Sequence, residues 1–335
     1  MKPETLLYPA PKGLYCQKGD FYIDPVQPVE RALVTHGHSD HARAGHAHVL
    51  ATRETLDIMA IRYGDGFCGS CEVARLGETI AINGVRVSFH PAGHVLGSAQ
   101  ISVEAEGARI VVSGDYKRRP DPTCLGFEPV PCDVFITEAT FGLPVFHHPD
   151  DAAEVQRLLM SLRQFPERSH VVGAYALGKA QRLIALLRQQ GYFEPIHIHG
   201  ALAKLCDYYR SVGIDLGDLR HATIEGSRQD LAGSIVIGPP SAFAERWARR
   251  FAEPLAIFAS GWMLIRQRAK QRGVELPLVI SDHCDWAELT ATIREIAPGE
   301  VWVTHGREEA LVRWCQLQGI PARPLHLVGY DDEGE

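Results

Sequence analysis

The pattern of hydrophobic residues changes twice along this chain of 335 residues, and these two changes constrain the fold more than any other feature. Up to about residue 142, short Val- and Ile-rich runs lie between turns, and several alternate polar with apolar residues as sheet strands do. From about residue 150, amphipathic helical stretches alternate with short apolar strands, which is typical of a parallel α/β unit. After about residue 279 the first pattern returns. We therefore expect two domains, or one large domain that carries an insertion.

The same patterns place individual elements. In the first segment we expect mostly antiparallel sheets, with strands within residues 13–18, 21–24, 31–36, 48–51, 79–84, 85–92, 98–105, 108–115 and 133–140. One helix is expected over residues 52–64, with Thr52 as its N-cap and Gly64 as its stop. In the middle segment we expect helices within 151–165, 178–191, 201–213 and 243–251, and strands within 170–175, 195–200, 233–240 and 255–260. The last segment predicts strands within 276–283 and 301–305 and helices within 285–297 and 307–319.

Charge is divided along the same boundaries. The net charge of −7 by itself argues against a nucleic-acid partner. Residues 143–279, however, contain 17 Lys and Arg against 13 Asp and Glu, a balance of +4, so the remaining segments carry −11. The acidity thus belongs to the segments that hold the candidate metal ligands, and the basic middle segment is free to face an anion.

The cellular location follows from what the sequence lacks. There is no run of eighteen apolar residues and no secretory signal at the N-terminus, so we expect a cytoplasmic protein with no membrane partner. A reducing compartment would keep the eight cysteines as thiols. Cys68 and Cys71 form one CxxC, but a structural zinc site needs two further ligands at a matching spacing, so we expect two thiols rather than a zinc knuckle.

The segment THGHSDH places four groups that can bind a metal within six residues, directly after a predicted strand. These groups are His36, His38, Asp40 and His41. Crowded at one strand end, they would repel and desolvate one another unless a positive ion lies among them. Residues i and i+2 of an extended segment point the same way, and the turn that follows aims the next two ligands at a neighbouring position. The motif therefore indicates a metal site.

Three more ligand-type residues end apolar runs, namely His94, Asp115 and His305. Strand ends are where the loops of a sheet protein converge into one site. Imidazole and carboxylate ligands suit zinc, manganese or iron better than calcium. Seven ligands exceed the needs of one tetrahedral ion, and they fit two ions, such as Zn²⁺ or Mn²⁺. His36, His38 and His94 would bind one ion, Asp40, His41 and His305 the other, and Asp115 would bridge them. A two-ion site of this kind predicts hydrolysis of phosphate esters.

At this point the chain resembles the metallo-β-lactamase superfamily and, within it, the β-CASP nucleases. The resemblance covers essentially the whole chain and rests on segments that occur in the family's order: FYIDP, THGHSDH, AGHVLGSA, SGDYKR, ITEATFG, VVGAYALGKAQRLIALL, ASGWM, ISDHCDW and WVTHGRE. It implies a four-layer αβ/βα sandwich formed by residues 1–142 and 280–335, with a parallel α/β β-CASP domain, residues 143–279, inserted between them. It also implies the same seven metal ligands.

The resemblance assigns further roles. Asp24 matches a carboxylate that orients the HxHxDH loop, as outer-shell partners of metal-bound imidazoles commonly do. Glu138 and His283 match the family's acidic and histidine pair. A protonated imidazole can donate to a poor alkoxide leaving group, and a carboxylate on its other nitrogen keeps it oriented. We therefore expect His283 to be the general acid, steadied by Glu138, and we count Asp40 and Asp24 with them as residues needed for catalysis.

The middle segment suggests phosphate contacts. Its basic residues were expected to line one wall of a cleft and bind backbone phosphates: Lys179, Arg182, Arg246, Arg249, Arg250, Arg266, Arg268, Lys270 and Arg272. Ser260 and Gly261, together with the helix start at LGKAQ, would offer backbone amides to a phosphate.

The choice of substrate rests on motifs that disagree. The histidine in WVTHGRE resembles the RNA-processing branch of the family, whereas ASGWM and the compact length resemble the bacterial ligase-associated DNA exonucleases. We favour DNA, hydrolysed from 5′ to 3′ in DNA repair and with a ligase as a possible partner. An RNA-processing nuclease is the first alternative. A small-molecule metallo-hydrolase is the second, although such an enzyme would not need the α/β insertion or the Glu138 and His283 pair. The oligomeric state stays open.

Overall fold

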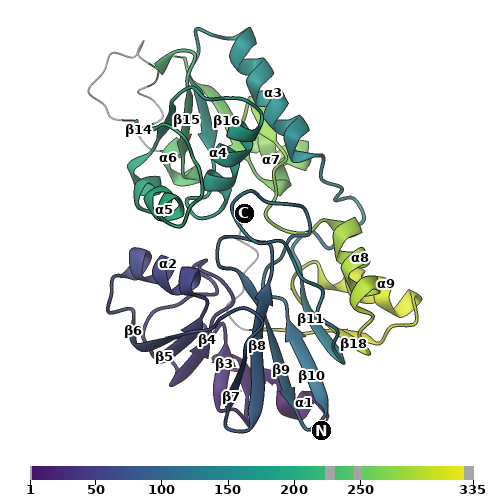
Figure 1. The fold of residues 1–335 in the computed structure, drawn as a ribbon. Helices are drawn as coiled ribbons and strands as arrows, with labels where there is room; N and C mark the ends of the chain where they lie inside the picture. Colours follow the sequence, from purple (N-terminus) through teal and green to yellow (C-terminus); the bar gives the residue numbers. More distant parts are fainter. Residues whose placement is uncertain (1, 223–230, 245–246, 248–250, 252, 328–335) are drawn as a thin grey trace. The chain divides into compact units, whose positions relative to one another are not determined.

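The computed structural model of the protein describes residues 2–222, 231–244, 247, 251 and 253–327. The chain forms two compact units. In Figure 1 the first combines the purple and blue N-terminal part with the yellow C-terminal part, and the second is teal to green. One unit comprises Met1–His147 and His283–Gly334, and the other comprises His148–Asp282. The boundaries expected from the sequence pattern lie a few residues earlier, at 142/143 and 279/280. Residues 280–282 belong to the second unit, where side chains of two helices bind them, as described below.

The first unit contains two sheets, of which one has the strand order β1-β2-β3-β4-β5-β6. Its strands are β1 (Tyr8–Ala10), β2 (Gly13–Cys16), β3 (Phe21–Ile23), β4 (Arg31–Leu33), β5 (His46–Ala51) and β6 (Cys68–Val73). β1, β2 and β3 pair antiparallel, whereas β3, β4, β5 and β6 pair parallel. The carboxyl end of β4 leads directly into the HxHxDH loop.

The other sheet has the order β19-β18-β11-β10-β9-β8-β7. Its strands are β7 (Thr79–Ile82), β8 (Val85–Pro91), β9 (Ala99–Ala105), β10 (Ala108–Val112), β11 (Val134–Ala139), β18 (Glu300–Gly306) and β19 (Ala322–Pro324). β7 to β10 pair antiparallel, and β10, β11, β18 and β19 pair parallel. The expectation of mostly antiparallel sheets is therefore wrong: three of five pairings in the first sheet and three of six in the second are parallel. Alternation of residue types reports which face is buried and not the direction of the neighbouring strand.

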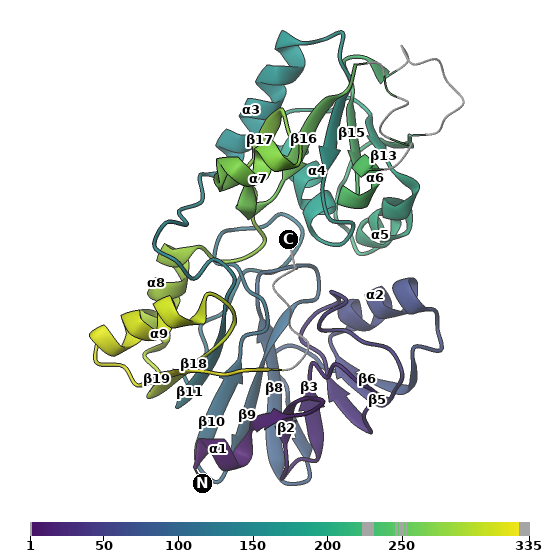
Figure 2. The same ribbon diagram turned by 180° about the vertical axis from the view of Figure 1, so that it is seen from behind.

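The two sheets pack face to face, with helices on their outer faces (Figures 1 and 2). One buried cluster joins side chains of both sheets, among them Phe21 and Leu50 from the first and Phe89 and Ile101 from the second. Helix α2 (Arg53–Tyr63) covers the outer face of the first sheet, and α8 (Trp286–Ile296) and α9 (Glu308–Leu317) cover that of the second. A short α1 (Pro3–Leu6) precedes β1. The unit is thus layered helix, sheet, sheet, helix, and the chain is a mixed α/β protein.

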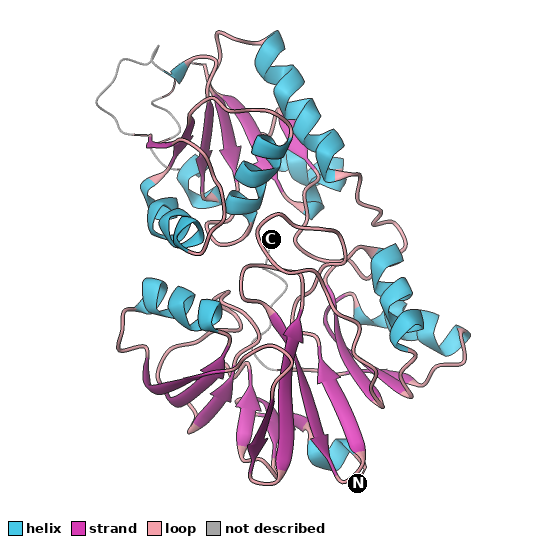
Figure 3. Cartoon of the chain, viewed as in Figure 1, coloured by secondary structure: helices cyan, strands magenta, loops and turns pink. Residues whose placement is uncertain are grey.

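The second unit is built on a six-stranded sheet of order β14-β13-β15-β12-β16-β17 (Figure 3). Its strands are β12 (His170–Gly173), β13 (Ile196–Ile198), β14 (Leu219–His221), β15 (Ile235–Gly238), β16 (Leu255–Ala259) and β17 (Leu276–Leu278). Every pairing between them is parallel, as the alternation of strands and helices predicted. Its helices are α3 (Asp151–Gln164), α4 (Lys179–Gln189), α5 (Gly200–Ser211), α6 (Pro240–Ala244), the 3₁₀ helix η3 (Gly261–Leu264) and α7 (Arg266–Gln271).

Local signals were accurate where capping residues mark an end. The amide of Thr55 donates to the Thr52 side chain, which caps α2, and the helix ends at Gly64. Most of the helix expected over 243–251 falls outside the described residues. Short elements such as β1, β6 and η3 were missed, because a few residues carry too little periodicity to show. Within the described ranges, no helix is both long and apolar enough to cross a bilayer.

Candidate metal centre

All seven predicted ligands lie in the first unit, at or beyond the ends of its strands. Four of them, His36, His38, Asp40 and His41, lie in the loop between β4 and β5. The other three are His94 after β8, Asp115 after β10 and His305 near the end of β18. The fold therefore brings together segments that are far apart in the sequence, as the positions at strand ends predicted.

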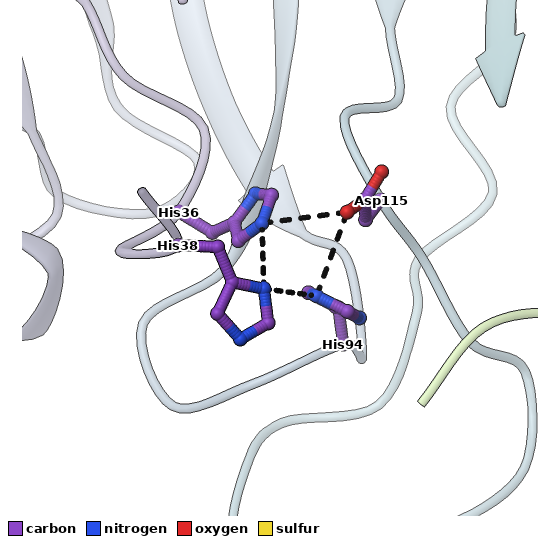
Figure 4. A group of neighbouring side chains, drawn as sticks. All are labelled: His36, His38, His94 and Asp115. Carbon is purple, nitrogen blue, oxygen red and sulfur yellow. Dashed lines mark hydrogen bonds and ion pairs between the residues drawn. The ribbon is translucent and has the colours of Figure 1, made fainter. Parts of the chain in front are cut away.

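Three imidazoles converge on one point (Figure 4). Nδ1 of His38 lies 3.1 Å from Nε2 of His36 and 3.0 Å from Nε2 of His94. Ligand atoms of these three residues and of Asp115 all lie within 4.8 Å of one another. His36, His94 and Asp115 are buried, and His38 is partly exposed, so the cluster opens to solvent on the His38 side.

This donor set fits a cation. Without an ion, one proton can form a hydrogen bond between Nδ1 of His38 and one of the two neighbouring nitrogens. The lone pair of the remaining nitrogen then faces another lone pair at about the same distance, which is unfavourable. A divalent ion among them accepts all three lone pairs at once, and the Asp115 carboxylate supplies negative charge. Imidazole nitrogens with a carboxylate oxygen are the ligands that zinc and manganese take.

Asp115 connects this cluster to the second predicted set. Its Oδ2 lies 3.5 Å from Nε2 of His36, 3.7 Å from Nε2 of His94 and 3.5 Å from Nε2 of His41. Nε2 of His41 in turn lies 3.6 Å from Oδ2 of Asp40. One carboxylate oxygen thus faces imidazoles of both predicted sets.

His305 completes the second set less tightly. Its ring stacks on that of His41, with 5.4 Å between the ring centroids. The residue lies at a β-bulge, because β11 pairs Glu138 with Thr304 but Ala139 with Gly306. The extra residue, His305, has φ +60°, and such bulges re-aim a side chain next to a site. A Cβ at the next position, Gly306, would lie 2.3 Å from the carbonyl oxygen of Ala139, so the bulge requires glycine there.

Asp24 holds the HxHxDH loop as predicted for an outer carboxylate. Its Oδ1 accepts from the amide of Thr35 at 2.8 Å, and its Oδ2 accepts from the Thr35 hydroxyl at 2.6 Å. The same Oδ2 lies 2.8 Å from Nδ1 of His41. A proton on that nitrogen leaves Nε2 of His41 as a lone pair directed at Asp115. Thr35 was not singled out from the sequence, since a threonine before the motif has no distinguishing pattern.

In the metal-free site, the surroundings keep some histidine rings neutral, so that these rings have a lone pair for a metal ion. Burial and the neighbouring His41 and His94 hold the pKa of His36 well below its ordinary value. Burial and His41 lower the pKa of His305 to about 4. Burial alone would raise the pKa of Asp115, but His41 and His283 beside it hold that pKa well below its usual range. Burial alone would lower the pKa of His41, but Asp115, Asp40 and Asp24 beside it raise that pKa well above its ordinary value. At neutral pH the metal-free site therefore presents neutral imidazoles at His36 and His305, a protonated His41 and an ionised Asp115. A bound ion would replace the proton on Nε2 of His41.

Gly114 allows the Asp115 loop to approach the HxHxDH loop. It has φ +56°, and a Cβ at this position would lie 2.8 Å from Cβ of Thr35. A larger residue would push the carboxylate away from the imidazoles. The glycine in the motif SGD is thus explained by close packing of two loops.

The Glu138 and His283 pair also lies in the first unit. Nδ1 of His283 is 3.0 Å from Oε1 and 3.0 Å from Oε2 of Glu138, and both side chains are buried. Glu138 accepts further hydrogen bonds from the amide of Tyr116 at 2.9 Å and from the hydroxyl of Thr140 at 2.5 Å. The ring of His283 lies 4.8 Å from that of His94, and ligand-type atoms of Asp115, Glu138 and His283 lie within 4.8 Å of one another. The pair therefore stands beside the metal ligands.

The predicted phosphate contacts are in the second unit, and their groups are already engaged. Lys179 is fully buried, and its Nζ lies 3.1 Å from Oδ2 of Asp282. Arg182 is also buried and binds Asp151 and Asp282. The expectation that these two cations face a phosphate is wrong for this structure, because buried cations need carboxylate partners and have found them.

The amides expected to bind phosphate show the same pattern. At the start of α4, the amide of Gly178 donates to Oε1 of Gln181 at 2.9 Å, and the amide of Lys179 donates to the carbonyl oxygen of Leu177. The hydroxyl of Ser260 accepts from the amide of Trp262, and Ser260 and Gly261 are buried at the start of η3. Arg266, Lys270 and Arg272 are exposed, while Arg246, Arg249 and Arg250 lie outside the described residues.

Cys68 and Cys71 lie on β6, which has a neighbour on one side only. All eight cysteines are free. The two groups of side chains that could hold a metal within the described ranges do not include a cysteine.

Comparison with known proteins gives relatives but no matching family model. A probable DNA ligase of Opitutus terrae is 26% identical over 327 residues, which are 96% of this chain and 31% of that protein. Cleavage and polyadenylation specificity factor subunit 3 of Dictyostelium discoideum is 37% identical over 145 residues, 40% of this chain and 18% of that protein. Subunit 3-I of the same factor in Arabidopsis thaliana is 23% identical over 380 residues, 88% of this chain and 54% of that protein.

The chain is thus shorter than these relatives and spans 18% to 54% of their lengths. Among solved structures, a protein of unknown function from Enterococcus faecalis V583 superposes with a TM-score of 0.57 at 12% identity, over 90% of this chain and 80% of that one. At this identity the similarity shows a shared fold alone.

Proposed function

We propose that the chain is a β-CASP nuclease of the metallo-β-lactamase superfamily, which hydrolyses phosphodiester bonds with two divalent metal ions. The observation that carries this proposal is the convergence of His36, His38, His94 and Asp115 on one point, with the Glu138 and His283 pair beside them. The same proposal assigns the first unit to the four-layer metallo-β-lactamase sandwich and the second to the inserted β-CASP domain.

The seven ligands have distinct tasks in this proposal. His36, His38 and His94 would hold one ion, Asp40, His41 and His305 the other, and Asp115 both. Zn²⁺ or Mn²⁺ at these positions would activate water and offset negative charge on the phosphate. Asp24 keeps His41 in the tautomer that binds through Nε2, because its Oδ2 lies at Nδ1 of that ring. Thr35 fixes Asp24 in turn through two hydrogen bonds.

His283 acts on the leaving oxygen. Glu138 occupies Nδ1 of the ring, so Nε2 is the atom left to donate a proton. When the P–O bond breaks, the electron pair goes to the 3′- or 5′-oxygen, and the proton from Nε2 neutralises it. Glu138 is held in place because it also accepts hydrogen bonds from the amide of Tyr116 and the hydroxyl of Thr140. An imidazole held by a carboxylate is favoured in the protonated form that this step needs.

We propose DNA as the substrate, cleaved as a 5′-to-3′ exonuclease in repair. What supports this choice is that nearly the whole chain aligns with part of a longer protein named as a probable DNA ligase. A ligase is accordingly a candidate partner, and a cytoplasmic location is consistent with eight free thiols. The alternative is an RNA-processing nuclease, because other relatives are named as subunits of a cleavage and polyadenylation factor or as endoribonucleases. A small-molecule hydrolase is the third candidate, and no observation favours it.

The test is an end-labelled substrate series. Metal-loaded protein is incubated with single- and double-stranded DNA and RNA that carry a 5′ label, with and without chelator. Release of labelled mononucleotides from DNA, abolished by the chelator, supports a 5′-to-3′ DNA exonuclease. Cleavage of RNA alone transfers the proposal to RNA processing. Hydrolysis of thioesters without cleavage of either nucleic acid would refute the nuclease.

A further inference from the structure

The residues immediately before His283 are bound by side chains of α3 and α4. The amide of Val279 donates to Oε2 of Glu154 at 2.7 Å. The carbonyl oxygen of Ile280 accepts from Nζ of Lys179 at 3.0 Å, and that of Ser281 accepts from Arg182. Three consecutive residues of an irregular segment thus each have a backbone group bound by a charged side chain.

The fourth residue of the segment, Asp282, is held by the same two cations. Its Oδ2 lies 3.1 Å from Nζ of Lys179, and its Oδ1 lies 3.0 Å from a guanidinium nitrogen of Arg182. Arg182 also binds Asp151 at the start of α3. Lys179, Arg182, Asp151 and Asp282 are all buried, and their formal charges cancel. We call these four residues the buried ion cluster.

If its only effect were on stability, the buried ion cluster would be an inefficient means of stabilising the fold. Removing two cations and two carboxylates from water costs several kcal/mol per ion, and apolar residues of similar volume often stabilise a fold as well or better. What ions and their hydrogen bonds do provide is a defined geometry for the groups that they bind. Here the bound groups are two carbonyl oxygens and the carboxylate of the residue that directly precedes His283.

His283 is fixed on its other side as well. The amide of Cys284 donates to the carbonyl oxygen of Tyr116 at 2.9 Å, and Asp285 caps α8 through the amide of Glu288. The backbone of His283 therefore has little freedom from either direction. Its side chain reaches Glu138 from this backbone, so a shift of the preceding peptide would displace the ring.

We propose that Lys179, Arg182 and Asp282 are positioning residues that fix the backbone from which His283 donates its proton. The inference rests on the proposed function of His283 as general acid. It also explains why Lys179 and Arg182, in the segment LGKAQR that resembles a β-CASP segment, face carboxylates rather than solvent. None of the three is a catalytic residue, since each acts through the chain segment that precedes His283.

The first test compares two leaving groups. Asp282→Asn and Lys179→Met remove one charge each with little change in volume. Each variant is assayed on a DNA oligonucleotide, whose alkoxide leaving group needs a proton, and on thymidine 5′-(p-nitrophenyl phosphate), whose leaving group does not. We expect kcat on DNA to fall about 10- to 100-fold with KM nearly unchanged. The rate on the nitrophenyl ester should change less than about threefold, because the metal ligands are intact.

A double-mutant cycle separates positioning from general damage. In a His283→Ala background, Asp282→Asn should cause no further loss on DNA, because the group that it positions is absent. The matched control is Arg188→Lys. Arg188 is another buried cation of α4, but it binds the carbonyl oxygens of Leu216 and Asp218, outside the segment before His283. This control should leave both substrates unaffected, or lower both equally if it loosens the unit.

A measurement that does not depend on activity tests the inference even if the proposed function is wrong. The Nδ1–H proton of His283 is identified by NMR with ring-¹⁵N histidine, as the signal that disappears in His283→Ala. It should shift or broaden in Asp282→Asn and in Lys179→Met, and stay unchanged in Arg188→Lys. If wild-type protein cleaves neither substrate, the proposed function fails and this spectrum alone decides the positioning. An unchanged signal in both variants, or equal losses on both leaving groups, would overturn it.

Discussion

Nδ1 of His283 lies 3.0 Å from each carboxylate oxygen of Glu138, although the two residues are 145 positions apart in the sequence. This contact directs Nε2 of the ring away from Glu138, and Nε2 is the atom that we propose as the proton donor. Glu138 is held in turn by Tyr116 and Thr140, so the carboxylate cannot turn away from the histidine without losing those bonds.

Replacing His283 by Ala should therefore impair the departure of the leaving group and spare the metal ions. We expect kcat on DNA to fall by about 10²- to 10⁴-fold, the usual contribution of a general acid. The rate on a p-nitrophenyl phosphodiester should be close to that of wild type. Steady-state kinetics on both substrates measure this, with Phe193→Ala as a control at an exposed site of the second unit. Equal losses on both substrates would argue for a structural role of His283.

Replacing Asp24 by Asn should weaken metal binding without unfolding the protein. The substitution keeps the volume but replaces one oxygen by an NH₂ group, which cannot accept from Thr35 or from His41. Loss of such an outer-shell partner typically costs about 10- to 100-fold in metal affinity. Competitive titration with a chelating dye measures this affinity. A variant with the affinity of wild type would show that Asp24 does not orient His41.

Gly306→Ala tests whether the bulge places His305. The added Cβ would lie 2.3 Å from the carbonyl oxygen of Ala139, and φ +77° is unfavourable for alanine. Such a strained residue costs about 1 to 3 kcal/mol, so we expect a lower free energy of unfolding and loss of the metal held by His305. Denaturant titration and metal analysis measure the two effects. Gly319→Ala is the control, because φ is also positive there but a Cβ would meet no atom within 4 Å.

The second unit should lose stability in mild acid through His170. This residue is fully buried, and burial lowers its pKa below the ordinary value. A histidine whose pKa is lower in the folded state binds more protons when unfolded, so the free energy of unfolding falls as pH drops through the ordinary pKa of about 6.5. In His170→Gln this part of the pH dependence should be reduced. Urea titrations at several pH values between neutral and pH 5 give the free energy of unfolding of wild type and variant. If this free energy falls equally steeply with pH in both proteins, the assignment to His170 is contradicted.

Strand ends and capping residues made much of the fold predictable. Thr52 and Gly64 mark the two ends of α2, and the strand ends at His94 and Asp115 carry ligands of the converging cluster. In the first unit the direction of pairing was not predictable, because the residue pattern of a short strand such as β4 does not distinguish a parallel from an antiparallel neighbour. In the second unit it was, because strands alternate with helices.

Two features of the site could not be predicted from the sequence. The bulge at His305 depends on the pairing of β18 with β11, which no local pattern encodes. The partners of Lys179 and Arg182 are distant in sequence, so a basic pair at a helix start indicated an anion, and the anion is the protein's own Asp282. Motifs thus predicted candidate ligands that lie close together in the fold, and tertiary contacts decided which charges are already paired.

The most direct test of the account is metal analysis of the purified protein together with its nuclease rate. Wild-type protein loaded with Zn²⁺ or Mn²⁺ should bind about two ions per chain, as a two-metal site requires, and its cleavage of DNA or RNA should rise with occupancy. Asp115→Asn, which weakens the bridge between both ligand sets, should lose metal and activity together while keeping its circular dichroism spectrum. A folded wild-type protein that binds no divalent ion, or one that cleaves nucleic acid equally well after complete metal removal, would contradict the account.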